Sequence, residues 1–163
     1  MTDQGQVITL DPAGILTVSP RDEEFDAHAF TTDEEAATLI GIRDRQVIAR
    51  RIRYNGSTAW TSVVEEFPEG LQQNFQFTAA QTSSDIYVGW RLTTTEVRNR
   101  RPLVARLSIS RGARAWVTML PETIDLGAEI DQLVADEHGV TAWLNDRAYP
   151  FDGLRSALVA FDP

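Results

Sequence analysis

Arginines gathered in two short stretches are the side chains of this 163-residue sequence best suited to bind a partner. One stretch is VIARRIRYNGSTAWTSVV, residues 47–64, and the other is RNRR, residues 98–101. A guanidinium group offers a planar fork of N–H donors that can hold a carboxylate or a phosphate through two parallel hydrogen bonds. The candidate binding residues are therefore Arg50, Arg51, Arg53, Arg98, Arg100 and Arg101.

The charge pattern around these arginines allows two arrangements. Two arginine-rich blocks, residues 37–64 and 91–121, alternate with three acidic blocks in a chain of net charge -9. If the two blocks fold side by side, they form a positive face for a phosphate-rich or acidic partner. If acidic segments fold over them, the charges form intramolecular pairs, which contribute little at a surface. We favour the second arrangement, and the negative net charge argues against nucleic acid as a partner.

The first arginine stretch is expected to form a strand with a conflict in its side-chain pattern. Strict alternation points Arg50 to one face and both Arg51 and Arg53 to the other, so at least one arginine faces the apolar side. We predict either a bulge at Arg50–Arg51 or an inward Arg50 paired with Glu65 or Glu66, because an unpaired buried charge is too costly. Arg51 and Arg53 would then lie exposed on the outer face. An inward Arg50 that anchors an anionic ligand is the alternative.

Residues for covalent or metal chemistry are scarce. The sequence has no Cys, which excludes disulfides, thiolate metal sites and cysteine nucleophiles. His28 and His138 are not arranged as in a zinc-binding motif, and no nucleophile elbow, P-loop or dinucleotide-binding motif occurs. His28 follows Asp26 closely enough to be oriented as a general base, but an exposed histidine is the favoured interpretation. We therefore predict no catalytic residue, no metal site and no cofactor.

Short apolar runs separated by turn residues predict the elements that position these side chains. They indicate a mainly β fold, an antiparallel meander of about 8–10 short strands that forms a barrel or a sandwich. The strongest turn signal is Asn55-Gly56, for which we predict a type I′ turn because such a turn needs positive φ at both central residues. Further hairpins are predicted within residues 7–18, 74–95, 103–120 and 140–151.

Three short helices are also predicted, at about 32–41, 126–137 and 153–161. Thr32 and Glu35 have the spacing of a capping box at a helix N-terminus. Ile130, Leu133 and Val134 follow one helical stripe, although the end of this segment could instead begin a hairpin. The third segment has a potential N-cap residue followed by an apolar stripe at helical spacing.

The four tryptophans each fall on a predicted strand. One tryptophan per strand is typical of an aromatic core layer, which is the interpretation we favour. A stacking platform for sugars or bases is the alternative. The residues are Trp60, Trp90, Trp116 and Trp143.

Length and composition indicate a single β-rich domain over residues 1–163, since a chain of this length can bury one sufficient core. The first residues show no signal-peptide pattern, and nowhere do about 18 apolar residues run together, so we expect a protein that is cytoplasmic or otherwise soluble, without a signal peptide or membrane insertion. Virion association and signal-independent export remain open. The chain is acidic and lysine-free, because all 15 of its basic residues are Arg.

These features favour a non-enzymatic protein-interaction or assembly module, of an accessory, immunity or virion type, whose partner is another protein. The missing catalytic motifs and the segregated charge support this expectation. One alternative is a β-barrel that binds a small anionic or amphipathic ligand. Another is a hydrolase or transferase that uses only carboxylates and Arg.

Overall fold

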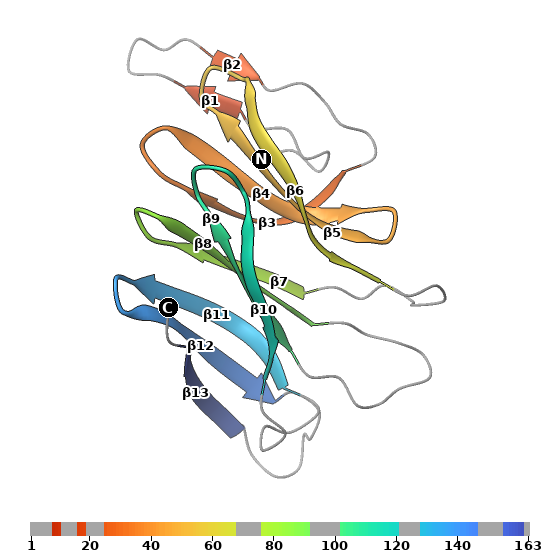
Figure 1. The fold of residues 1–163 in the computed structure, drawn as a ribbon, viewed down its shortest axis with the longest axis vertical. Helices are drawn as coiled ribbons and strands as arrows, with labels where there is room; N and C mark the ends of the chain where they lie inside the picture. The colour runs from red at the N-terminus through yellow and green to blue at the C-terminus, as the bar shows by residue number, and fades with distance from the viewer. Residues whose placement is uncertain are drawn as a thin grey trace. The chain divides into compact units, whose positions relative to one another are not determined.

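The structure is a computed structural model, and it describes residues 8–10, 16–18, 25–67, 76–91, 102–120, 128–146 and 155–161. The chain divides into two compact units, residues 1–67 and 68–163. Strands dominate the described residues and all strand pairs are antiparallel, which confirms a mainly β fold (Figure 1). The described ranges contain no apolar helix of membrane-spanning length. The expectation of a single domain stays a prediction.

The first unit contains a short two-stranded sheet and a four-stranded meander. In the meander the strands lie in their chain order, β3-β4-β5-β6, so each consecutive pair is a hairpin. Its apolar cluster contains Phe25, Leu39, Ile48 and Ile52, with Ala27 packed against it. The strands of this unit are β1 (Ile8–Leu10), β2 (Leu16–Val18), β3 (Asp26–Thr32), β4 (Ala36–Arg43), β5 (Gln46–Arg53) and β6 (Thr58–Glu66).

The second unit contains a four-stranded sheet, in the order β10-β9-β8-β7, and a three-stranded sheet, in the order β11-β12-β13. β11 lies along β7 and β8, so the two sheets face one another. The strands are β7 (Gln76–Gln81), β8 (Asp85–Arg91), β9 (Leu103–Ser108), β10 (Arg114–Met119), β11 (Ala128–Asp136), β12 (Gly139–Asp146) and β13 (Arg155–Phe161).

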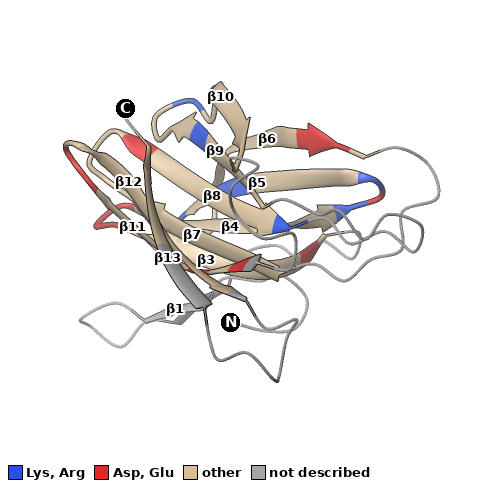
Figure 2. Ribbon diagram, turned by 90° about the horizontal axis from the view of Figure 1, so that it is seen from below, with Lys and Arg blue, Asp and Glu red and all other residues tan. Residues whose placement is uncertain are grey.

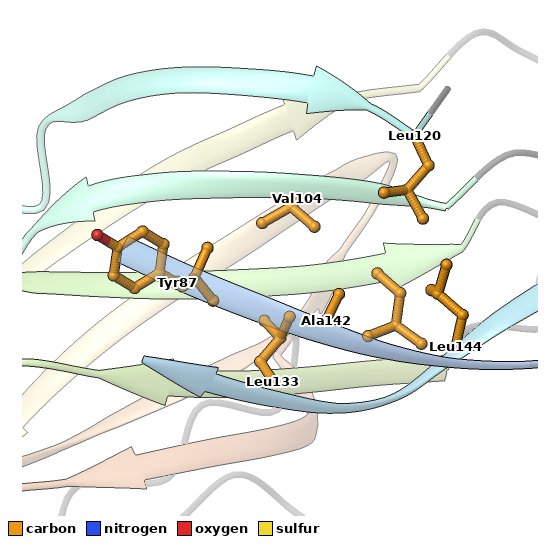
Figure 3. Packing of buried hydrophobic residues seen from close by; sticks show 8 residues of the cluster. Tyr87, Val104, Leu120, Leu133, Ala142 and Leu144 are labelled. Atoms are coloured by element: carbon orange, nitrogen blue, oxygen red, sulfur yellow. The ribbon is translucent and has the colours of Figure 1, made fainter. Parts of the chain in front are cut away.

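Both sheets of the second unit contribute to one buried core (Figure 3). Gly89 on β8 allows the close approach of the sheets, because a Cβ atom there would lie 3.0 Å from the Ile130 Cδ1 atom of β11. Trp116 stacks on Phe161 with ring centroids 6.2 Å apart, which adds an aromatic contact between β10 and β13. The buried core residues are Tyr87, Val104, Leu120, Ile130, Leu133, Val140, Ala142 and Leu144.

The hairpins predicted within residues 7–18, 47–64, 74–95 and 103–120 are present, but two details of the architecture differ from expectation. The described sheets remain open at their edges, so the barrel alternative is wrong for this part of the chain. The described strands number thirteen, more than expected, because each segment predicted as a helix contains a strand. Of the expected hairpin at 140–151, β12 is present, but residues 147–154 lie outside the described residues.

The helix predicted at 32–41 is wrong, because this segment is the β3–β4 turn followed by β4. The Asp33 Oδ1 atom accepts hydrogen bonds from the backbone N–H groups of Glu35 and Ala36, at 2.9 and 3.0 Å. A helix N-cap residue accepts the same hydrogen bonds from the backbone. The acidic, polar sequence therefore favours capping of backbone N–H groups, and here these groups belong to a turn and not to a helix. Residues Ala36–Ile42 are then buried on both faces of the sheet, and such a continuous apolar run does not distinguish strand from helix.

The helices predicted at 126–137 and 153–161 are also wrong, since β11 and β13 occupy these positions. In β11 the pairing register shifts between Ile130 and Gln132, which makes Asp131 an extra residue. The bulge places Ile130 and Leu133, three residues apart, in the same core and so imitates helical spacing. The alternative of a hairpin into the following strand is confirmed, because β11 pairs with β12.

The Asn55-Gly56 turn joins β5 to β6, but it is not of type I′. Gly56 has a φ of 85°, whereas Asn55 is not among the described residues of positive φ. The Gly56 N–H donates to the Arg53 carbonyl at 2.9 Å, and Asn55 Oδ1 accepts the Ser57 N–H at 2.9 Å. This pattern belongs to a three-residue loop in which glycine alone takes the left-handed conformation. The hairpin was predictable because both loop types favour the same Asn-Gly pair.

Candidate functional site

Arg51, predicted to lie exposed on the outer face, is buried in the middle of the first unit's sheet with 7% of its surface accessible. Its Nη2 atom donates to the Asp33 Oδ2 atom at 2.6 Å, and its Nη1 atom donates to the Thr38 Oγ1 atom at 3.3 Å. Thr38 lies directly opposite Arg51 in the pairing of β4 with β5. The prediction for Arg51 is therefore wrong, and this guanidinium is engaged inside the fold.

The Asp33 carboxylate can pair with the Arg51 guanidinium because backbone hydrogen bonds in the β3–β4 turn already orient it. Partial burial by itself would raise the Asp33 pKa, but hydrogen bonds from Arg51 and from the backbone N–H groups of Glu35 and Ala36 outweigh it and lower the pKa. The Tyr54 hydroxyl donates to the Asp33 backbone carbonyl at 2.6 Å. The β3–β4 turn is thus tied to the far end of β5 through both the side chain and the backbone of Asp33.

Arg50 lies on the opposite face of β5 from Arg51, with the side chains of Ile48 and Ile52. Its Cζ atom is 5.3 Å from the centroid of the Phe25 ring, a cation–π distance. Pairing of Arg50 with Glu65 or Glu66 stays a prediction.

The bulge predicted at Arg50–Arg51 is wrong, because the extra residues of this hairpin lie on β6. Pairing of β5 with β6 shifts after Val47 and after Arg51, which makes Val64 and Ala59 the extra residues of β6. β5 itself keeps its alternation, so Arg50 and Arg51 point to opposite faces.

Arg53 is exposed, as predicted, and it is the last residue of β5 before the turn. Arg98, Arg100 and Arg101 lie outside the described residues. Of the six candidate binding residues, the structure therefore places three on β5, with Arg50 on one face and Arg51 on the other. They do not form one positive face.

Arginines of the second arginine-rich block also form ion pairs within the fold. The Arg106 Nη2 atom donates to the Asp85 Oδ2 atom at 3.0 Å across β9 and β8, and Arg91 Nη1 donates to Glu129 Oε1 at 3.0 Å between β8 and β11. The hydrogen bond from Arg106 is the main reason that the Asp85 pKa is lowered. Acidic blocks therefore supply the partners of these arginines, and Figure 2 marks both basic and acidic segments along the strands.

The outward face of β11–β12–β13 carries a group of exposed apolar side chains that the sequence reasoning missed. Inward residues of β12 are buried in the core, whereas Trp143 between them is 48% exposed. Leu158, directly opposite Trp143 on β13, is 68% exposed, and Val134 on β11 is 59% exposed. We call Val134, Trp143 and Leu158 the outer apolar patch.

The signal for this patch was present in the alternation of β12. Val140, Ala142 and Leu144 share one face, so Trp143 must point to the other. The interpretation of all four tryptophans as core holds for Trp90, which is fully buried, and is wrong for Trp143. Leu158 was missed because its segment was assigned to a helix.

Each of the two histidines lies beside a carboxylate. His28 Nε2 lies 3.2 Å from Asp26 Oδ2, and His138 Nε2 lies 3.6 Å from Glu137 Oε1 in the exposed β11–β12 turn. Within the described ranges, no three His, Asp or Glu side chains gather closely enough to hold a metal ion.

Comparison with known proteins adds no functional information to this geometry. No protein-family model matches the sequence, and no curated protein is significantly similar to it. The functional conclusion therefore depends on the surfaces described above.

Proposed function

We propose that this protein is a non-enzymatic interaction module that binds a partner protein through the outer apolar patch. The observation that carries the proposal is the exposure of Trp143 at 48% on a strand whose inward residues Ala142 and Leu144 are 0% and 1% exposed. The core of the second unit is complete without Trp143, because the side chains of the inner face already fill it. An exposed tryptophan beside two more exposed apolar residues is typical of a protein-binding surface.

The setting of Trp143 suits a binding anchor. Trp143 is in the central strand of its sheet, opposite Gln132 on one side and Leu158 on the other. The sheet fixes the backbone that carries this side chain, so ordering Trp143 against a partner costs little additional entropy. Trp is among the residues that contribute most when they fill a partner's pocket.

Acidic residues at one end of the sheet indicate the complementary chemistry of the partner. Asp136 and Glu137 are exposed at the turn that joins β11 to β12, in a chain of net charge -9. We infer a partner that offers an apolar pocket for Trp143 and basic side chains at its rim, since charge complementarity at the rim steers association.

The experiment compares an exposed apolar residue inside the patch with one outside it. A partner captured from the source cells by the wild-type chain is titrated against Trp143→Ser and Met119→Ser; Met119 is 54% exposed on β10, outside the patch. Trp143→Ser should weaken binding at least tenfold, while Met119→Ser should leave it within about twofold. Equal affinities for both variants, or the absence of any partner that depends on Trp143, would overturn the proposal.

A further inference from the structure

β13 is an edge strand with regular backbone geometry. In the sheet order β11-β12-β13, it is bonded on one side to β12, and no other described strand flanks it (Figure 1). An edge strand directs alternate N–H and C=O groups away from its sheet, and these groups are a template for another strand. Seven consecutive residue pairs join β13 to β12 without any shift in register.

Several other strands at the sheet edges carry features that discourage further pairing. β7 has neither a bulge nor a charged residue, but β11 lies along it. β3 has an extra residue at His28, β10 has one at Ala115, and β11 has one at Asp131. β6 contains two such positions and ends in two glutamates. Bulges and charges of this kind are common protections of sheet edges. β13, with the sequence RSALVAF, has no bulge and only one charged residue, Arg155.

β13 is also suited to pair with itself. Leu158 is the midpoint of Arg155–Phe161, so antiparallel pairing about Leu158 matches all the residues of the strand with those of a second β13. Arg155 would lie opposite Phe161 of the partner subunit, so no two like charges would face each other. Neither strand brings an acidic residue to the seam, although the chain as a whole has a net charge of -9.

We propose that β13 forms this antiparallel pair with a second copy of the chain, with Leu158 against Leu158 of the partner subunit. Directly opposite residues of antiparallel strands have Cα atoms about 4.5–5.5 Å apart, so the two leucines, each 68% exposed in the single chain, cover one another. The outer apolar patches of the two copies then lie on the same face of one continuous sheet. The proposal goes beyond the binding of a partner protein because it assigns the backbone edge of β13, which shares only Leu158 with the outer apolar patch.

A cysteine-based experiment tests the register directly, because the chain has no Cys of its own. In the proposed register the Cα atoms at position 158 lie within the range that a disulfide spans. The Cα atoms at position 160 are offset by four residues along the strands, about 14 Å. Ala160 is exposed on the same strand, so Ala160→Cys is a matched control for Leu158→Cys.

Under mild oxidation, full-length Leu158→Cys should form a disulfide-linked dimer at least ten times faster than Ala160→Cys. Equal rates, or no dimer from Leu158→Cys, would show that the chains do not pair in this register and would overturn the proposal. Wild-type chain should also show a reversible, concentration-dependent dimer in sedimentation equilibrium, since a seam of one strand is smaller than the interface of a permanent dimer.

A second pair of variants separates edge pairing from contact between the apolar faces. Leu158→Lys places two like charges opposite each other and should raise the dimer dissociation constant at least tenfold. Val134→Lys changes the same face of the sheet on β11, away from the edge formed by β13. It should leave the dimer dissociation constant within about twofold. If both variants weaken association equally, the faces and not the edges are in contact, which overturns the proposal. These measurements use the purified chain alone, so their outcome is independent of whether Trp143 binds a partner protein.

Discussion

The arginine hairpin of the first unit and the three-stranded sheet of the second unit differ in how many of their faces are covered. β5 is central in its sheet, and Val47, Ile48 and Ala49, which alternate between its two faces, are all fully buried. β12 is also central, but only its inward residues are buried, and Trp143 faces outward with 48% of its surface exposed. The same strand alternation therefore leads to two different environments.

This difference explains why Arg51 is paired inside the fold while apolar side chains of the three-stranded sheet are exposed. Where both faces of a sheet are covered, a charged side chain such as Arg51 needs a partner of opposite charge within the fold. Here that partner is Asp33. Where one face is open, an apolar side chain can stay exposed without disturbing the core. Residue type alone, without the number of covered faces, did not reveal that Arg51 is buried or that Trp143 is exposed.

The comparison is tested most strongly at Arg51. Arg51→Gln should lower the free energy of unfolding by roughly 1.5–3 kcal/mol, because the partly exposed Asp33 carboxylate would lose its charged hydrogen-bond partner. Arg53→Gln, at an exposed position two residues away, should change it by no more than about 0.5 kcal/mol. Urea titrations of both variants measure the two values. Equal, small losses would show that the hairpin arginines are all surface residues.

Acid should weaken both units through one carboxylate in each. The pKa values of Asp33 and Asp85 are lowered in the folded protein from the ordinary value of 3.8. The folded state then binds fewer protons than the unfolded state, so these carboxylates stabilise the protein above about pH 4 and lose this effect as the pH falls through the lowered pKa values.

Urea titrations at pH 7 and pH 3 of the wild type, Asp33→Asn and Asp85→Asn measure this effect. Each substitution should reduce the loss of stability between the two pH values. A pH dependence that is unchanged in both variants would contradict the ion pairs with Arg51 and Arg106.

A moderate change in stability is expected at the outer apolar patch. Trp143→Ser should lower the free energy of unfolding by about 1–1.5 kcal/mol, because about half of this side chain is exposed and only the covered half is lost from packing. Its inward neighbour is the control: Leu144→Ala should cost roughly 2–5 kcal/mol, since it opens a cavity in the buried cluster. Thermal or urea unfolding measures the stability of both variants. A loss of stability for Trp143→Ser as large as that for Leu144→Ala would mean that this face belongs to the core.

The sequence by itself determined the hairpins, because turn chemistry is local. Asn55-Gly56, Pro12 to Gly14 and the run of polar residues at 82–85 each separate apolar runs, and strands flank all three positions. The exposure of Arg53, next to such a turn, followed from the same local pattern. The absence of Cys likewise excluded thiol chemistry without any structure.

Only the tertiary structure decided which strands have two covered faces, where the extra residues lie and which carboxylate meets which arginine. An extra residue at Asp131 changes the alternation of β11 so that its core residues have helical spacing. Asp33 caps a turn with the contacts of a helix N-cap and then reaches Arg51, eighteen residues further along the chain. Local propensity is the same in each alternative, so packing between segments distant in sequence selects the outcome. For the same reason the exposure of Trp143 and Leu158 became visible only when β11, β12 and β13 were assembled into a sheet with one open face.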